Sequence, residues 1–538
     1  MNLRIAMYLC VAWLFVVLLP VATFAQTPCE ALTNLTLTNA TVTSATSVAA
    51  GSYKPPAAPG QPAPNKDLPA FCRVDGVARP TSDSEIHFEV WLPLSGWNGK
   101  YEQVGNGGFA GMIPFRAMAE PLLHGYATAA TDDGHVSGPG ATWAVGHPER
   151  VKDFGYRAVH ETSVQAKLII HAFYGKDAFH SYFVGCSEGG REGLTEAQRY
   201  PDDFQGIVAG APAINWNHLQ TRGLWDELAF LETPDSYIPP AKLPVLQNGA
   251  IAACDAIDGV KDGFLENPSR CHFDPATIQC QGSDGSDCLT AQQVAAARKI
   301  YDPLKNPQTG ALIEPGFSPG NEAVPANWPV WITGSSAPQL GIQKLFANQF
   351  FADMVFENPK WNPNSFNFDT DVRITDDKLG VILNSADPNL RAFKARGGKL
   401  IQYHGWADAA IPPLSSIEYF ETVQKTMGDT KNFYRLFMVP TMSHCAGGPG
   451  ATIFGNAAGV PEEDADHDVV LALDRWVEKG VAPDHIIATG FVDNNPSKGI
   501  AMTHPLCPYP QEAHYKGTGD PKDAANFACE AQPPKSNK

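Results

Sequence analysis

The stretch Ser181-Tyr-Phe-Val-Gly-Cys-Ser-Glu-Gly-Gly190 decides the fold of this chain. Its first half is apolar and predicts a buried strand, and its glycines predict a tight turn. A helix-forming segment follows at 191–200, and the apolar segment Gly206-Ile-Val-Ala-Gly-Ala-Pro212 predicts another strand. A strand, a turn, a helix and a strand in this order are typical of a parallel sheet in an α/β protein.

The turn contains Gly185-Cys-Ser187-Glu-Gly189, which matches the pattern G-x-S-x-G. In enzymes with this pattern, the glycines allow a turn so tight that the serine oxygen stands clear of the backbone. The free amides at the start of the following helix favour a negative charge that develops there. We therefore predict Ser187 as a nucleophile; the alternative is a glycine-rich turn with an incidental serine.

The rest of the chain continues the alternation of strands and helices around a long interruption. Apolar patterning predicts strands at 86–92, 101–104, 126–131, 399–403, 433–439 and 486–491, and helices at 159–174, 415–427 and 468–479. The block 216–396 breaks this rhythm, and at roughly 180 residues it is too long for a loop, so we predict an inserted lid domain. We expect an α/β catalytic domain formed by 26–215 and 397–538, with a weakly structured stretch up to about Ala70.

A serine nucleophile needs a histidine base and a carboxylate that orients the histidine. Two loops after expected strands supply them: Asp408 follows the strand 399–403, and His444 follows the strand 433–439. Catalytic groups gather beyond the carboxyl ends of parallel strands, and the chain order Ser, acid, His is that of α/β-hydrolases. We predict Ser187, Asp408 and His444 as a triad; a solvated aspartate and a structural histidine are the alternatives for the two loops.

Composition and the N-terminus indicate an exported protein. The net charge is −18 and no long run of Lys or Arg occurs, which argues against nucleic acid or an anionic membrane as the main partner. Met1–Arg4 is basic, the following residues are apolar to about Phe24, and Ala25 precedes an expected cleavage site. This pattern is typical of a signal peptide at 1–25 and of a secreted or periplasmic protein; an N-terminal membrane anchor is the alternative.

The cysteines agree with an oxidising compartment. Eleven occur, and removal of Cys10 with the signal peptide leaves ten. Pairs that are close in sequence are Cys29–Cys72, Cys254–Cys271, Cys280–Cys288 and Cys507–Cys529. Cys186 and Cys445 remain, and they adjoin Ser187 and His444. If these two form a disulfide, their Cα atoms lie about 4.4–6.8 Å apart, so the serine and the histidine also lie close together.

These motifs together resemble the tannase and feruloyl esterase family. The resemblance rests on Gly-Cys-Ser-x-Gly-Gly at 185–190, on His404-Gly-Trp-Ala-Asp408 and on Ser443-His-Cys-Ala-Gly-Gly448. It covers most of the chain and implies a secreted α/β-hydrolase fold with a lid domain and a disulfide beside the serine and the histidine. It also implies an oxyanion hole formed by the amide of Glu188 and an amide of Gly105-Asn-Gly-Gly108, with Gly108 favoured over Gly107.

The insertion contains a candidate metal loop, Asp255-Ala-Ile-Asp258-Gly-Val260-Lys-Asp262-Gly-Phe264. Three carboxylates in a glycine-containing loop suit Ca²⁺, which prefers carboxylate and carbonyl oxygens; exposed Asp-Gly turns explain the same pattern. The resemblance implies a structural Ca²⁺ here. Its ligands are then Asp255, Asp258, Asp262 and the carbonyls of Val260 and Phe264. No organic cofactor is expected.

Aromatic residues in the insertion indicate the substrate class: Trp328, Trp331, Phe346, Phe350, Phe351 and Trp361. Such side chains suit a planar aromatic acyl group, although most of them also fit the core of a lid. We expect a serine esterase for phenolic acids such as ferulate or gallate, whose ester is a small molecule or part of a polysaccharide or polyphenol. Its acyl-enzyme intermediate forms on Ser187, and no oligomeric state is predicted.

Three other functions stay open at this point. Relatives of mono(hydroxyethyl) terephthalate hydrolase bind the distal carboxylate with a lid arginine, whereas no Arg occurs here between Lys299 and Asp371, which disfavours a terephthalate monoester. A binding protein on a decayed hydrolase scaffold would usually lack one residue of the triad. A serine peptidase of the same fold is disfavoured by the aromatic insertion.

Overall fold

The computed structural model describes residues 26–55, 67–136, 140–337, 339–456 and 460–531. The expected signal peptide, 1–25, lies outside these residues. Among the described residues, no helix has both the length and the apolar character needed to span a membrane. Five disulfides join the cysteines in the pairs considered above: Cys29–Cys72, Cys186–Cys445, Cys254–Cys271, Cys280–Cys288 and Cys507–Cys529. Five disulfides fit an extracellular protein.

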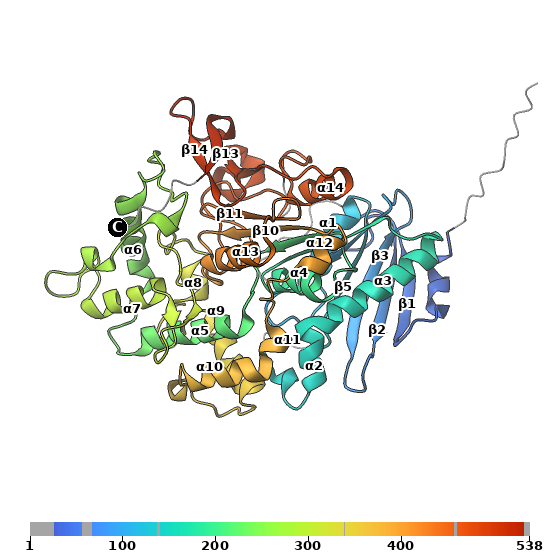
Figure 1. Ribbon diagram of the computed structural model, residues 1–538, viewed down its shortest axis with the longest axis horizontal. Coiled ribbons are helices and arrows are strands. Elements are labelled where there is room, and N and C mark those ends of the chain that lie inside the picture. Colours follow the sequence, from blue (N-terminus) through green and yellow to red (C-terminus); the bar gives the residue numbers. More distant parts are fainter. Residues whose placement is uncertain (1–25, 56–66, 137–139, 338, 457–459, 532–538) are drawn as a thin grey trace, which may run out of the picture.

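The molecule is built on a nine-stranded sheet in the order β1-β2-β3-β5-β4-β6-β7-β10-β11 (Figure 1). The strands are β1 (Ala40–Val48), β2 (Phe71–Ala78), β3 (Ile86–Pro93), β4 (Lys100–Val104), β5 (Ala127–Thr131), β6 (His180–Cys186), β7 (Gly206–Gly210), β10 (Lys399–Gly405) and β11 (Tyr434–Val439). Neighbours from β1 to β5 pair antiparallel, and neighbours from β5 to β11 pair parallel. The parallel part brings the carboxyl ends of β4, β6, β10 and β11 to one edge.

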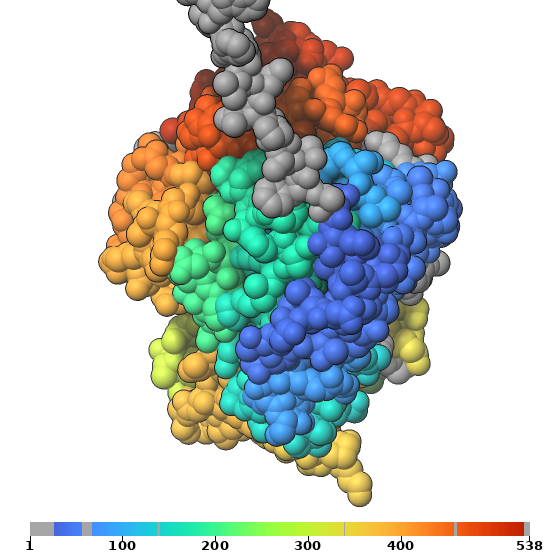
Figure 2. Space-filling view, turned by 90° about the vertical axis from the view of Figure 1, so that its right-hand side faces the viewer, coloured from blue at the N-terminus to red at the C-terminus, as the bar shows by residue number. Residues whose placement is uncertain are grey.

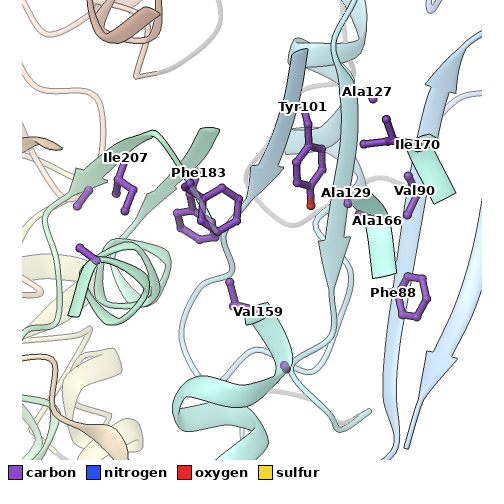
Figure 3. Packing of buried hydrophobic residues seen from close by; sticks show 14 of the residues in the cluster. Phe88, Val90, Tyr101, Ala127, Ala129, Val159, Ala166, Ile170, Phe183 and Ile207 are labelled. Carbon is purple, nitrogen blue, oxygen red and sulfur yellow. The ribbon is translucent and has the colours of Figure 1, made fainter. Parts of the chain in front are cut away.

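Helices cover both faces of the sheet. One face carries α3 (Ala158–Tyr174), α4 (Glu188–Arg199) and α13 (Leu414–Met427), and the other carries α1 (Phe115–Leu123) and α14 (Val469–Lys479). Figure 3 shows Ala166 and Ile170, one helical turn apart in α3, beside Ala129 of β5 and Val90 of β3. Their spacing of four residues places both side chains on the face of the helix that meets the sheet.

The N-terminal stretch is more regular than the sequence predicts. β1 pairs antiparallel with β2 and forms an edge of the main sheet, at the end of the molecule seen in Figure 2. Within β1 only Val42 and Ala45 are buried, so the apolar pattern on which the prediction relied is weak there. The disulfide between Cys29 and Cys72 further ties this stretch to β2.

The last predicted strand forms but does not join the main sheet. β12 (Ile486–Phe491) pairs antiparallel with β13 (Ile500–Leu506) in a separate two-stranded sheet. β14 (Gln511–Tyr515) and β15 (Phe527–Ala531) form another. Apolar patterning predicts a strand but does not specify its partner, which depends on how the chain turns after Phe491.

The regular structure in the block 216–396 is mainly helical, and the block lies away from β1 (Figure 1). Its helices are α5 (Trp216–Leu231), α6 (Leu243–Cys254), α7 (Ala291–Tyr301), α8 (Trp328–Trp331), α9 (Ile342–Gln349), α10 (Thr370–Thr375), α11 (Val381–Leu383) and α12 (Arg391–Ala395). Two short strands, β8 (Leu304–Lys305) and β9 (Leu312–Glu314), pair with each other. Phe230, Leu246, Ile300 and Trp328 belong to a buried apolar cluster built mainly from this block.

Candidate active site

Ser187 lies in a sharp turn between β6 and α4. Its backbone has φ 67° and ψ −120°, a region that residues with a side chain rarely adopt. The surrounding glycines allow close packing: a Cβ atom on Gly190 would lie 2.2 Å from the carbonyl oxygen of Gly210, and one on Gly185 would lie 2.5 Å from that of Gly189. The turn therefore needs glycine at both positions and places the half-buried serine at the end of β6.

Two loops at the same edge bring an imidazole and a carboxylate to Ser187. His444 follows β11, and its Nε2 lies 2.9 Å from Ser187 Oγ. Asp408 follows β10, and its Oδ2 lies 2.8 Å from His444 Nδ1. The Asp408 side chain is fully buried, and 12% of the His444 side chain is exposed. The structure thus unites the three residues that the sequence places in this order.

Hydrogen bonds hold Asp408 in its charged form. Its Oδ1 accepts from the amides of Ala410 at 2.8 Å and Ile411 at 2.9 Å. Burial alone would raise the pKa of Asp408, but the charge of His444 and hydrogen bonds from His404 and His444 hold that pKa well below its ordinary value. The carboxylate is therefore ionised wherever the imidazole can act as a base.

A disulfide connects the turn of Ser187 to the loop of His444. Cys186 and Cys445 are 259 positions apart in sequence, and their Cα atoms lie 5.9 Å apart. Each cysteine adjoins one partner of the Ser187–His444 hydrogen bond. The covalent link limits how far the two loops can separate.

The predicted oxyanion loop, Gly105-Asn-Gly-Gly108, follows β4 and lies against the start of α4. The Asn106 amide donates to Glu192 Oε2 at 2.9 Å, and the Gly189 amide donates to the carbonyl of Asn106 at 3.0 Å. Gly108 has φ 63°, in the left-handed region. Glu188 is the first residue of α4, so its amide has no acceptor within the helix.

Sequence analysis missed a cluster of buried carboxyl groups beside this loop. Oxygens of Asp133, Glu188 and Glu192 all lie within 4.8 Å of one another, and Arg191 forms an ion pair with Glu188. Burial and the neighbouring carboxylates raise the pKa of Asp133 well above its ordinary value. A signal was present: Glu188 and Glu192 are four residues apart, which places them on one side of a helix.

Two of the six aromatic residues singled out in the insertion lie against the site. The Trp331 ring meets the His444 ring edge to face, with 4.9 Å between centroids and 73° between planes. A Cβ atom on Gly108 would lie 3.1 Å from Phe346 Cζ. The other four pack elsewhere: Trp328 in the cluster of the insertion, and Phe350, Phe351 and Trp361 in a neighbouring cluster.

The carboxylates of the predicted calcium loop bind backbone amides of the same loop. Oδ1 atoms of Asp255, Asp258 and Asp262 accept from Gly263, Val260 and Phe264 at 3.0, 2.9 and 3.1 Å. The three side chains do not form one of the described groups whose oxygens all lie within 4.8 Å. Burial, opposed by the Val260 amide and helped by the charges of Asp262 and Glu266, raises the pKa of Asp258 to about 6. Oxygen donors that disfavour their own charge suit a cation that would compensate it.

Comparison with known proteins agrees with the geometry. The family model of tannase and feruloyl esterase matches residues 72–530. A protein of Xanthomonas campestris named an uncharacterized esterase is 43% identical over 491 residues, which cover 87% of this chain and 85% of that protein. A probable feruloyl esterase B-2 of Aspergillus terreus is 34% identical over 469 residues, covering 85% of this chain and 86% of that protein.

Solved structures show the same fold. Feruloyl esterase B from Aspergillus oryzae superposes with a TM-score of 0.85 at 30% identity, covering 93% of this chain and 99% of that one. A tannin acyl hydrolase from Aspergillus niger superposes with a TM-score of 0.73 at 26% identity, covering 92% of both chains. These structures confirm the predicted α/β-hydrolase fold.

Proposed function

The chain belongs to the tannase and feruloyl esterase family of carboxylic ester hydrolases, and we propose that it hydrolyses esters of phenolic acids through an acyl-enzyme on Ser187. The continuous hydrogen bonding from Ser187 through His444 to Asp408 carries this proposal. In the proposed reaction, His444 takes the proton of Ser187 Oγ while that oxygen attacks the ester carbonyl carbon. Asp408 fixes the imidazole and stabilises its protonated form.

The amides of Glu188 and Gly108 are proposed to bind the carbonyl oxygen as it becomes negative. His444 then gives its proton to the leaving alcohol, and the acyl group stays on Ser187. A water molecule next loses a proton to His444 and attacks the acyl carbon. The bond from that carbon to Ser187 Oγ then breaks, His444 returns the proton to Oγ, and the acid is released. The half-buried rings of Trp331 and Phe346 offer apolar faces for a planar acyl group.

Ferulate and gallate esters fit these surroundings better than a terephthalate monoester. Gly108 lies close to Phe346, and Trp331 borders His444, whereas the basic residues at 301–370 are limited to three lysines. A distal carboxylate would have to be buried without an arginine partner. The proposed alcohol half is a small alcohol, a polysaccharide or a polyphenol, and the proposed location is outside the cytoplasm, after removal of 1–25.

The decisive experiment replaces Ser187 by Ala. We expect loss of hydrolysis of methyl ferulate, methyl gallate and a terephthalate monoester with an unchanged far-UV circular dichroism spectrum, because the change removes one oxygen. A fluorophosphonate should label Ser187 in the unaltered protein, which peptide mass spectrometry can check. Turnover within about tenfold of the unaltered protein would refute the nucleophile.

We also propose that Asp255, Asp258, Asp262 and the carbonyls of Val260 and Phe264 hold a structural Ca²⁺. The ion would compensate the charges of these carboxylates, of which Asp255 and Asp258 are half-buried, and stabilise the folded state by mass action. Chelation should lower the melting temperature of the unaltered protein, and Asp258→Asn should reduce that effect. Asp493→Asn, at an exposed aspartate, is the control. A melting temperature that chelation leaves unchanged would contradict the site.

A further inference from the structure

A second histidine lies on the carboxylate of the proposed triad. His404 of β10 is completely buried, and its Nε2 lies 3.3 Å from Asp408 Oδ2 and 3.2 Å from the carbonyl oxygen of Ile411. Its Nδ1 lies 2.7 Å from Ser416 Oγ. The proposed reaction uses His444 alone, so His404 has no role in it so far.

The neighbours of His404 determine where its proton lies. Nε2 faces two acceptors, a carboxylate and a carbonyl, and must therefore carry hydrogen. Ser416 Oγ accepts from Gln402 Nε2 at 2.6 Å, so the hydroxyl hydrogen is available for Nδ1 of His404. Tyr434 in turn donates to Gln402 Oε1. With hydrogen on Nε2 of His404, the hydrogen bonds run in one direction, from Tyr434 through Gln402 and Ser416 to His404 and towards Asp408.

Strand geometry builds this arrangement. Gln402 and His404 are two residues apart in β10, so both side chains point to the same face of the sheet. Helix α13 covers that face and supplies Ser416. All of the side chains from Tyr434 to Asp408 in this series are buried. Polar groups in such a place are tolerated because each of them is hydrogen-bonded, and the network fixes the side chains in one arrangement.

We infer that His404 is a positioning residue that orients the Asp408 carboxylate and limits how strongly it attracts the protonated form of His444. This inference rests on the proposed triad. Asp408 Oδ2 is hydrogen-bonded to His444 and lies 3.3 Å from Nε2 of His404, which it shares with the carbonyl oxygen of Ile411, while Oδ1 is held by two amides. The ionisable groups that act on Asp408 are His444, in the loop after β11, and His404 itself, in β10.

Removal of the His404 donor should change the pH dependence of the enzyme. Without it, more charge stays on Oδ2 and stabilises protonated His444, so His444 keeps its proton to higher pH. In His404→Leu, we expect the acid limb of the kcat/KM profile for methyl ferulate to move to higher pH. We expect kcat at its plateau to fall on the order of ten- to a hundredfold, since a hydrogen bond to a charged group is lost.

Two further variants separate this role from simple packing. The amide nitrogen of Gln can reach the place of Nε2. In His404→Gln, the acid limb should therefore lie close to its position in the unaltered protein. Ser416→Ala removes the donor that polarises His404 and should move the limb in the same direction by less. Ser163→Ala, in α3, removes an equally buried hydroxyl outside this network and should leave the limb in place.

The outcomes distinguish the inference from the proposal beneath it. An acid limb that stays in place in folded His404→Leu, while Ser187→Ala is inactive, overturns the inference alone. If His404→Leu does not fold, an unmoved limb in Ser416→Ala overturns it in the same way. Activity that persists in Ser187→Ala would remove the triad and, with it, the role of His404.

Discussion

Ser187 lies between one buried carboxylate, Asp408, and a cluster of three buried carboxyl groups, and the pKa values of Asp408 and of Asp133 in the cluster shift in opposite directions. On the histidine side, Asp408 accepts hydrogen bonds from two amides and from His444, with His404 Nε2 at 3.3 Å, and its pKa falls below its ordinary value. On the oxyanion side, no donor from outside the cluster reaches either oxygen of Asp133 among the described residues, and the pKa of Asp133 rises. Burial is nearly complete in both places. The supply of donors, not burial, decides which carboxyl group is charged.

The difference suits the proposed chemistry. A charged Asp408 stabilises the imidazolium that forms as Ser187 loses its proton. Negative charge beside the proposed oxyanion would oppose the reaction, and the raised pKa of Asp133 reduces that charge. Arg191 balances Glu188 on that side, and Glu192 holds the loop of Gly108 through the Asn106 amide. The second group can therefore support the oxyanion hole without repelling its charge.

The largest predicted effect follows from removal of the Asp408 charge on the histidine side. Asp408→Asn keeps the shape of the side chain but removes the charge that orients and stabilises the imidazole of His444. We expect kcat for methyl ferulate to fall by about 10⁴-fold, the loss typical of this change in a serine triad, with the protein still folded. Steady-state kinetics and circular dichroism test this. A fall of less than tenfold would show that Asp408 does not orient the base.

The next largest effect follows from removal of the disulfide that joins the turn of Ser187 to the loop of His444. In the double variant Cys186→Ala, Cys445→Ala, the Ser187–His444 distance is no longer limited by a covalent bond. A misplacement of about 1 Å costs on the order of a hundredfold in rate, so kcat should fall by that amount while the protein is still folded. Removal of Cys507–Cys529, whose Cα atoms lie 5.5 Å apart, is the matched control and should leave kcat nearly unchanged. Equal losses of kcat in both variants would show that the Cys186–Cys445 bond only stabilises the fold and does not position Ser187 and His444.

Sequence patterns predict the residues that meet on the histidine side, because a short local pattern marks each of them. Ser187 is marked by glycines within five residues, and Asp408 and His444 each follow an apolar strand, so parallel pairing brings them to one edge. The cysteines beside Ser187 and His444 add a geometric restraint. The fold follows from the same alternation, except where partner choice is not local, as in β1 and β12.

The sequence does not predict the carboxyl cluster on the oxyanion side, because its residues come from separate elements. Asp133 follows β5, while Glu188 and Glu192 lie in α4, and only tertiary packing buries all three together. His404 stands in a motif that the sequence shows plainly, but its hydrogen bond to Ser416 depends on how α13 packs on β10. Residues whose role depends on burial between elements carry no local pattern.

The smallest predicted effect concerns Asp133 on the oxyanion side and is measured through the pH dependence of stability. Folding raises the pKa of Asp133. The contribution of this residue to the free energy of unfolding is therefore fully present below the ordinary pKa of about 3.9 and declines as pH rises above it. This decline is at most about 1.4 kcal/mol per pH unit. Asp133→Asn is neutral throughout and lacks it, so its melting temperature should gain on that of the unaltered protein as pH rises from about 4 towards neutrality.

Two controls fix the sign of this measurement. Asp177→Asn, at a side chain that is 83% exposed, should show no such trend. Asp408→Asn should show no trend between about pH 4 and neutrality, because a lowered pKa stabilises the native state by a constant amount above the ordinary value of about 3.9. Only below that value does the unaltered protein lose this advantage as pH falls, so the melting temperature of Asp408→Asn should then rise relative to it. The absence of a trend for Asp133→Asn as well, between about pH 4 and neutrality, would mean that Asp133 is charged in this range. The cluster beside the oxyanion loop would then hold a negative charge at neutral pH, and its compatibility with the oxyanion would have to rest on Arg191 alone.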